Sequence, residues 1–229
     1  MNALSGIRAC VFDAYGTLFD FASAAARCEG VPDENRPALT TLWRDKQLQY
    51  TWLRTLQGRY ADFWHVTSDA LAFSLDSLGL EDAALHDRLM ALYLTLDAFA
   101  EVPETLEKLK ASGFRLAILS NGTEAMLAAA AERAGIAPLF DRVFSVDALR
   151  FFKTHPSVYR HACDALELAA NQICFCSSNG WDAYAASDFG MRVAWINRYG
   201  LRAERLPGAP DLELQSLLEL PTRLLSCRA

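Results

Sequence analysis

Several features that would mark a particular class of protein are missing from this sequence. It has no apolar run long enough to cross a membrane, and its first six residues lack the charged-then-apolar pattern of a leader. It has no cluster of basic residues, and its net charge of −6 argues against a nucleic-acid surface. We therefore expect no membrane and no nucleic-acid partner, and a small molecule as the ligand.

Cysteine and histidine do not occur in informative patterns. The six cysteines are scattered, mostly within apolar segments, in a chain of 229 residues that is too large to need disulfides. The four histidines lack the spacing of metal ligands. We expect reduced thiols in a cytoplasmic protein. The hydrophobic share of 52% with 22% charged residues is ordinary for a soluble enzyme.

The stretch from residue 7 to residue 20 holds the most informative pattern. A short apolar run ending in Val11 and Phe12 is typical of a strand buried on both faces, and Gly16 allows a turn soon after it. Asp13 would then lie at the carboxyl edge of a sheet, where doubly wound folds bind ligands. The residues alone leave three roles open for this carboxylate: nucleophile, metal ligand or cap of the turn.

The apolar period becomes helical between residues 31 and 99. Apolar residues from Leu39 to Trp64 recur at spacings of three and four, which predicts one long amphipathic helix or a helix pair. Ser68 is a candidate cap for a following helix that Gly79 would end, and leucines near residue 89 indicate one more. We predict a helical cap subdomain at 21–98, inserted into an α/β core formed by 1–20 and 99–229.

Strands and helices alternate after residue 99. The expected strands are 115–119, 142–145, 173–176 and 192–196, and the expected helices are 103–112, 123–134, 157–166 and 181–189. This alternation predicts a doubly wound parallel sheet of the Rossmann-like α/β class. We expect a surface loop at 201–211, which contains two prolines and a glycine, and a closing helix at 212–225.

Polar side chains follow three of the expected strands. They are Ser120 with Asn121, Lys153, and 177–179 with Asp182. The carboxyl ends of parallel strands meet at one edge of a sheet, so these residues should converge around Asp13. A surface loop explains any one of the groups equally well, but it explains less easily why all of them lie at the same edge.

The motifs of the chain resemble those of the haloacid dehalogenase superfamily. Residues 13–18 are similar to its first motif, 119–122 to its second, Lys153 with Pro156 to its third, and 177–182 to its fourth as found in the L-2-haloacid dehalogenases. Residues 43–54 resemble the cap motif of that subfamily. The resemblance covers nearly the whole chain and implies a homodimer formed through the helical insert.

Two positions differ from the phosphatases of the superfamily. Where those enzymes carry a second aspartate as general acid, this sequence has Tyr15, and where they carry a magnesium-binding aspartate, it has Ser178. A phenol with a pKa of about 10 cannot replace a carboxylic acid of similar strength. Magnesium prefers charged oxygen ligands. We therefore expect no metal and no cofactor.

The resemblance implies hydrolysis of short-chain L-2-haloalkanoic acids. Asp13 would attack C2 and form an ester, Lys153 would keep Asp13 ionised, and Asp182 would orient or activate the water that hydrolyses the ester. The product would be the 2-hydroxy acid of inverted configuration. Arg44 from the insert would receive the halide together with Asn121 and Trp181, although a lone arginine on a helix is more often a solvated charge.

Further residues complete the expected site. Thr17 and Ser177 offer hydroxyls to Asp13, and Ser120 offers one to the substrate carboxylate, although turn capping accounts for such hydroxyls about as well. The resemblance places Tyr159 against the active-site lysine and includes Asn179 in the catalytic set.

An apolar wall around the alkyl part of the substrate is expected from four side chains. They are Tyr15, Leu48, Trp64 and Trp181. Aromatic residues at helical spacing are more often simple core. Asp45, where the subfamily often has glutamine, could weaken or orient the neighbouring Arg44. The third motif departs from the commoner pattern by placing Thr154 and His155 before the proline.

Two other functions compete with this interpretation. The first is a magnesium-dependent phosphatase of the same superfamily, whose activity a chelator would abolish. The second is a non-catalytic member of the superfamily that uses the cleft only to bind a small acid or a protein partner. Arg44, Lys153 and Asp182 at the expected places argue against the second, since binding an anion would not call for two aspartates.

Overall fold

The computed structural model describes residues 4–21 and 29–226, and the statements below concern these residues. The first part of the predicted cap, 22–28, which includes Cys28, lies outside the described residues, as does Cys227. The cysteines at positions 163, 174 and 176 are free thiols. Within the described residues, no helix is both long enough and apolar enough to cross a bilayer.

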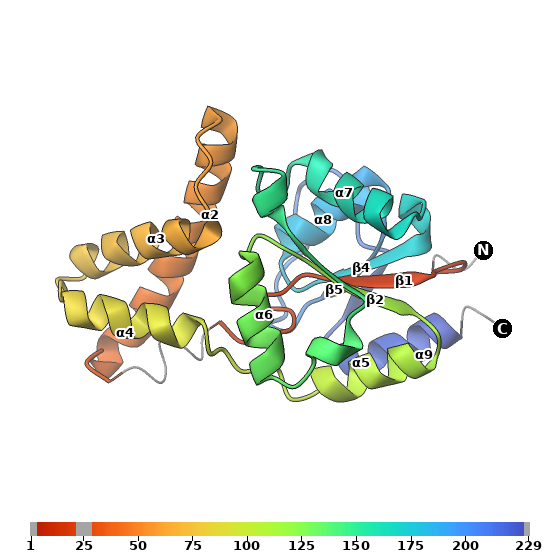
Figure 1. Cartoon of the computed structure of the whole chain (residues 1–229), viewed down its shortest axis with the longest axis horizontal. Helices are drawn as coiled ribbons and strands as arrows, with labels where there is room; N and C mark the ends of the chain where they lie inside the picture. The colour runs from red at the N-terminus through yellow and green to blue at the C-terminus, as the bar shows by residue number, and fades with distance from the viewer. Residues whose placement is uncertain (1–3, 22–28, 227–229) are drawn as a thin grey trace.

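One parallel sheet forms the centre of the molecule, with the strand order β3-β2-β1-β4-β5-β6 (Figure 1). The strands are β1 (Ala9–Phe12), β2 (Arg115–Ser120), β3 (Arg142–Ser145), β4 (Ile173–Ser177), β5 (Arg192–Ile196) and β6 (Leu212–Leu214). Every residue of β1 is buried, as its short apolar run predicted. The strand order reverses next to β1, so the residue that follows β1 lies at the ligand-binding edge. The doubly wound α/β class is confirmed.

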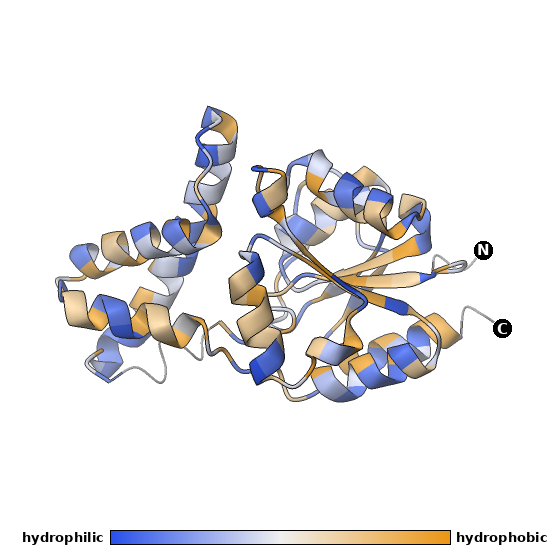
Figure 2. Cartoon of the chain, viewed as in Figure 1, coloured by the Kyte–Doolittle hydropathy of each residue, from blue (hydrophilic) through white to orange (hydrophobic). Residues whose placement is uncertain are grey.

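Helices cover both faces of the sheet. They are α5 (Val102–Ala111), α6 (Glu124–Arg133), α7 (Pro156–Leu166), α8 (Gly180–Phe189) and α9 (Leu220–Leu225). Figure 1 shows α7 and α8 together on one side and α5 and α9 on the other. Amphipathic sequence explains this packing: α7 starts at a proline and buries Val158, Tyr159, Ala162, Cys163 and Leu166, which recur at helical spacing. The strands are correspondingly the most continuously apolar elements in Figure 2.

Three further helices lie beside the sheet and come from the segment between β1 and α5 (Figure 1). They are α2 (Arg36–Gln57), α3 (Phe63–Ser77) and α4 (Ala83–Tyr93). The stretch from Leu39 to Trp64 thus forms the start of a helix pair, because Gly58 ends α2 with a φ of 63° and the side chain of Asp62 caps α3. The expected cap at Ser68 was wrong, since Ser68 lies inside α3.

The predicted closing helix at 212–225 was also wrong in its first half. Residues Leu212–Leu214 form β6, which pairs with β5, and the helix α9 starts only at Leu220 after the short 3-10 helix η5 (Leu217–Glu219). Short apolar runs fit a strand or a buried helix equally well by periodicity. Pro221 marks the true helix start, since proline is tolerated in a first turn. The expected loop at 201–211 has no regular structure.

The two segments that join the helices to the sheet run side by side. The amide of Asp20 donates to the carbonyl of Asp97 at 2.8 Å, and the amide of Phe99 donates to the carbonyl of Leu18 at 3.0 Å. Arg198, just after β5, donates to the carbonyl of Thr17 at 2.8 Å and pairs with Glu101. The two segments that lead to and from the helices are therefore joined to each other where they leave the sheet.

Candidate active site

Four chain segments deliver polar side chains to the carboxyl edge of the sheet. Asp13 follows β1, Ser120 ends β2, Ser177 ends β4, and Lys153 follows the 3-10 helix η3 (Val146–Ala148) after β3. Each of these side chains is nearly or fully buried. The expected convergence of the strand ends on Asp13 therefore exists in the fold.

The two carboxylate oxygens of Asp13 have different surroundings. Oδ1 accepts from the Lys153 ammonium at 3.0 Å. Oδ2 accepts from Thr17 Oγ1 at 3.0 Å, from Asn179 Nδ2 at 2.8 Å and, more weakly, from Ser177 Oγ at 3.4 Å. One oxygen thus faces a cation and the other a set of neutral donors, which fixes the orientation of the group.

Lys153 stands between two carboxylates. Its Nζ lies 3.0 Å from Asp13 Oδ1 and 2.7 Å from Asp182 Oδ2, and its side chain is 1% exposed. Burial alone would lower the pKa of Lys153, but Asp13 and Asp182 more than offset this and raise the pKa above its ordinary value. The lysine therefore supplies a buried positive charge between the two carboxyl groups.

Asp182 differs from an ordinary aspartate. Burial raises its pKa to about 6 despite Lys153, and the nearby charge of Asp13 adds to the rise. Tyr159 donates its hydroxyl proton to Asp182 Oδ1 at 2.7 Å, and Ser177 Oγ donates to Oδ2 at 3.2 Å. A carboxyl with a pKa near neutrality is suited to proton transfer. The expected contact of Tyr159 with Lys153 takes this indirect form, through Asp182.

Arg44 reaches the site from α2. Its guanidinium donates to Asn179 Oδ1 at 3.3 Å, and Asn179 donates in turn to Asp13. The other terminal nitrogen of Arg44 donates to Gln47 Oε1 at 2.8 Å, and the buried Gln47 is itself bonded to Thr67 of α3 at 2.7 Å. Side chains of α2 and α3 thus hold the arginine in place, so it is not a solvated charge. The neighbouring Asp45 is exposed.

A small cavity adjoins Asp13. Its volume is about 10 Å³, which is room for roughly one water molecule. The lining residues are Asp13, Tyr15, Arg44, Leu48, Phe63, Ser120, Asn121 and Trp181. An anion and a cation therefore line one small cavity together with both polar and apolar side chains. A haloacid is larger than this volume, so its binding requires groups around the cavity to move.

Most of the expected wall residues line this cavity, but Trp64 does not. Phe63, one position earlier on α3, takes that place and stacks on Tyr15 with ring centroids 5.7 Å apart. Sequence reasoning missed Phe63 because the inward face of a helix depends on where the helix starts. The cap at Asp62 was the signal that could have found it.

The second-motif residues have additional structural roles. The Asn121 Oδ1 accepts from the Lys153 amide at 2.9 Å, which leaves the amide nitrogen of its side chain as the group able to donate into the cavity. Ser120 Oγ accepts from the Gly122 amide at 3.1 Å and lines the same cavity. Both side chains are consequently fixed before any ligand binds.

The chain was compared with known proteins. A model of the haloacid dehalogenase-like hydrolases matches residues 7–190. The chain belongs to this family. It is 46% identical over 218 residues to (S)-2-haloacid dehalogenase 4A of Burkholderia cepacia, covering 95% of this chain and 94% of that one. It is 44% identical to (S)-2-haloacid dehalogenase 1 of Pseudomonas sp. (strain CBS-3), covering 96% and 97%.

Solved structures of haloacid dehalogenases have the same architecture. The L-2-haloacid dehalogenase from Xanthobacter autotrophicus with chloropropionic acid covalently bound superposes with a TM-score of 0.90 at 38% identity, covering 97% of this chain and 100% of that one. A dehalogenase with an intermediate complex gives a TM-score of 0.92 at 44% identity, covering 94% and 96%. The likeness therefore extends over both the sheet and the helices beside it.

The donor set of this haloacid dehalogenase-like hydrolase does not fit magnesium. In residues 4–21 and 29–226, no group of three or more His, Cys, Asp or Glu side chains could hold a metal ion. Asp13 and Asp182 both face the Lys153 ammonium, so a divalent cation between them would lie against a positive charge. Ser178, in place of the phosphatase aspartate, offers a neutral hydroxyl that lies 3.2 Å from Thr17 Oγ1.

Proposed function

We propose that the protein hydrolyses short-chain L-2-haloalkanoic acids to 2-hydroxy acids with inversion at C2. The reaction would pass through an ester on Asp13 and would use no metal. The observation that carries this proposal is the Asp13 carboxylate, which is held by Lys153 and lines the same small cavity as Arg44. The names of relatives that are 46% and 44% identical over nearly the whole chain support the same activity.

In the first step, Asp13 Oδ1 attacks C2 from the face opposite the halogen. A new O–C2 bond forms, the carbon–halogen bond breaks with its electron pair, and the halide leaves toward Arg44, Asn121 and Trp181. Oδ1 is the better candidate because its one donor among the described residues is Lys153, whereas Oδ2 already accepts from three groups.

In the second step, water attacks the carbonyl carbon of the ester. The carbonyl oxygen is then Oδ2, and its donors Thr17 and Asn179 are arranged to stabilise the oxyanion that develops there. Ser177 has a single hydroxyl proton, which lies within reach of both Asp13 Oδ2 and Asp182 Oδ2. One proton of the water passes to Asp182. Collapse of the intermediate then breaks the bond between the Asp13 carbonyl carbon and Oδ1, and Asp182 gives its proton to the departing alkoxide, which leaves as the 2-hydroxy acid. The second proton of the water is lost to solvent as the Asp13 carboxylate forms again.

Formation of the ester also prepares Asp182 to act as the base. The negative charge of Asp13 contributes to the raised pKa of Asp182, and this contribution disappears when Asp13 becomes a neutral ester. Lys153 then pairs with Asp182 alone, so the pKa of Asp182 falls below about 6 and the group is a carboxylate when water arrives. The base is therefore ionised in the step that needs it.

Halide release tests the proposal. We expect chloride from L-2-chloropropionate, none from the D enantiomer, and no effect of a chelator. Asp13→Asn should remove turnover, and a single turnover in heavy-oxygen water should place the label on the Asp13 side chain. Label found only in the product would show direct attack of water on C2 and contradict the ester. Phosphate release that a chelator abolishes would instead indicate a phosphatase.

We also propose that 21–98 is a cap subdomain and that the protein is a cytoplasmic homodimer formed through the cap. Support for the dimer comes from three exposed apolar side chains on α2: Trp52, Leu53 and Leu56, the last 83% exposed. Light scattering of the wild type and of Leu56→Glu tests the interface, since a charge there should yield monomers. A wild type that is monomeric at micromolar concentration would contradict it.

A further inference from the structure

The corner between α2 and α3 contacts the segment that leads into Lys153. The amide of Phe152 donates to Thr55 Oγ1 at 3.2 Å, and the Phe152 ring is fully buried. Tyr60 stacks on Phe152 with ring centroids 5.1 Å apart, and Phe63 packs against the same ring at 6.2 Å. Three residues of the helical part thus surround the residue that precedes Lys153.

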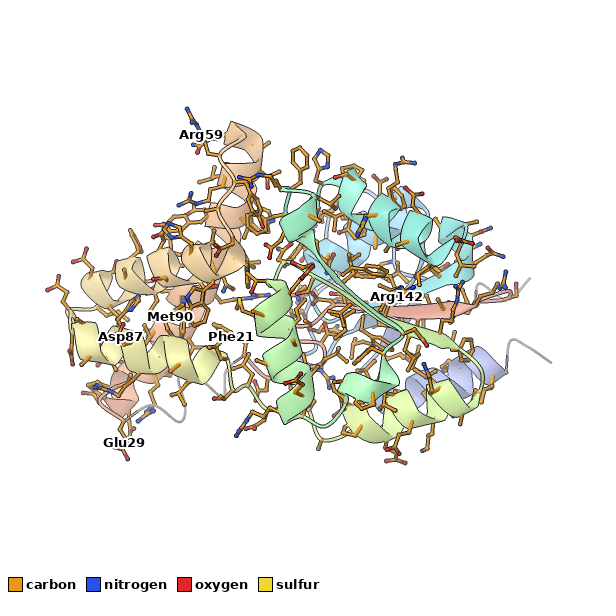
Figure 3. All side chains as sticks on the ribbon, viewed as in Figure 1. Phe21, Glu29, Arg59, Asp87, Met90 and Arg142 are labelled. Carbon is orange, nitrogen blue, oxygen red and sulfur yellow. The ribbon has the colours of Figure 1, made fainter. Side chains whose placement is uncertain are left out.

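One polar pair crosses the same boundary. The Tyr60 hydroxyl donates to Asp147 Oδ1 at 2.5 Å, and Asp147 belongs to the 3-10 helix η3 after β3. The guanidinium of Arg150 lies over the Tyr60 ring, 5.1 Å from its centroid. Burial, followed by the nearby carboxylate of Asp147, raises the pKa of Tyr60 above its ordinary value, so the phenol keeps its proton and donates. By contrast, Arg59, the residue before Tyr60, is exposed and points away from the sheet (Figure 3).

We propose that Tyr60 and Asp147 form a latch that holds the helical part closed over Asp13 and positions the segment ending in Lys153. Tyr60 acts as a positioning residue, since it touches neither Asp13 nor the cavity beside it. The cavity admits roughly one water when the latch is made, so the latch must open to admit a haloacid and close again for reaction. The kinetic consequences rest on the proposed function, whereas the structural consequences do not.

The Phe152 amide is a built-in reporter of the latch. Its hydrogen bond to Thr55 crosses the boundary, so its exchange with solvent follows opening of the latch. The Lys153 amide, one residue later, donates to Asn121 within the sheet domain at 2.9 Å. The two amides therefore distinguish opening at the boundary from loosening of the whole segment.

Tyr60→Phe is the decisive variant. It keeps the ring on Phe152 and removes only the donor to a carboxylate, a loss that shifts an equilibrium by about tenfold or more. We expect the Phe152 amide to exchange about tenfold faster and the Lys153 amide to exchange as in the wild type. The matched control is Tyr50→Phe, the same change on α2 at a ring that packs on Phe73 of α3. Unchanged Phe152 exchange in Tyr60→Phe, or equal acceleration in the control, would overturn the latch.

A second variant and the kinetics complete the test. Asp147→Asn keeps an acceptor for the Tyr60 hydroxyl. The Phe152 amide should therefore exchange more slowly in Asp147→Asn than in Asp147→Ala. Combining Asp147→Ala with Tyr60→Phe should add little to either single change.

With L-2-chloropropionate, Tyr60→Phe should raise KM several-fold and leave kcat within about twofold, because bound substrate itself favours the closed form. An equal loss of kcat would contradict a latch that acts through closure, and an inactive wild type would refute the proposed function while leaving the exchange result intact.

Discussion

Replacing Lys153 by methionine removes the one cation between two buried carboxylates. Methionine has a similar length and no charge, so Asp13 and Asp182, which are 5% and 0% exposed, would face each other without compensation. Removing one partner of a buried ion pair typically costs about 3–5 kcal/mol of unfolding free energy. Both carboxylates contact Lys153 in the wild type, so they lie close together. Without the lysine, their repulsion is relieved when one of them takes up a proton, and the pKa of the pair is therefore raised in the folded state.

The loss of unfolding free energy in Lys153→Met should increase with pH. Asp182 already has a pKa of about 6 with the lysine present, and without it the value moves higher. The folded variant then binds more protons than the unfolded chain, so its stability falls as pH rises through the raised pKa, by up to about 1.4 kcal/mol per pH unit for one extra proton. The loss relative to wild type should therefore be small at pH 5 and largest at pH 8.

Urea unfolding followed by circular dichroism at pH 5, 6.5 and 8 measures this loss. The matched control is Lys110→Met, which breaks a half-exposed pair with Asp141 and should cost under about 1 kcal/mol at each pH. Halide release should be mostly lost in Lys153→Met and unchanged in the control. A cost that is equal at all three pH values, or greatest at pH 5, would refute the account of Lys153 as the compensating charge.

Two further predictions concern the partners of these groups. Tyr159→Phe removes a hydrogen bond that lowers the pKa of Asp182, so the acidic limb of the kcat profile should move to higher pH than in the wild type; a limb that stays in place would mean that Asp182 is not the titrating base. Thr17→Val removes one donor to Asp13 Oδ2, and the ester should accumulate in a rapid-quench experiment because its hydrolysis slows by about 10²-fold. Slower ester formation with unchanged hydrolysis would instead place Thr17 in the first step.

The sequence predicted the polar side chains at the carboxyl edge of the sheet better than it predicted the connections around them. Asp13, Lys153 and Asp182 follow strands, and parallel strand ends must converge, so their meeting follows from topology. The strand at 212–214 was missed because three residues cannot show a period. Pairs between distant positions leave no local pattern at all.

Two such pairs are Tyr60 with Asp147 and Arg198 with Glu101. Their members lie 87 and 97 positions apart in the sequence, and each joins the helical part or its connection to the sheet domain. A single sequence shows four polar residues in unrelated segments, each of which reads as an ordinary surface group. Only the folded chain shows where these pairs lie. Arg198 and Glu101 meet beside the segments that connect the helices to the sheet, and Tyr60 and Asp147 meet at the other end of the helical part.

The proposed reaction gives Arg44 a specific role. In that reaction the negative charge that moves is first on Asp13, beside Lys153, and after carbon–halogen cleavage it would be on the halide, on the side of Arg44. The attraction between Arg44 and this charge therefore grows along the reaction, and a group of that kind affects kcat more than KM. We expect Arg44→Met to lower kcat by about 10²-fold with a smaller change in KM. If KM rises and kcat is unchanged, Arg44 binds the carboxylate of the substrate and another group receives the halide.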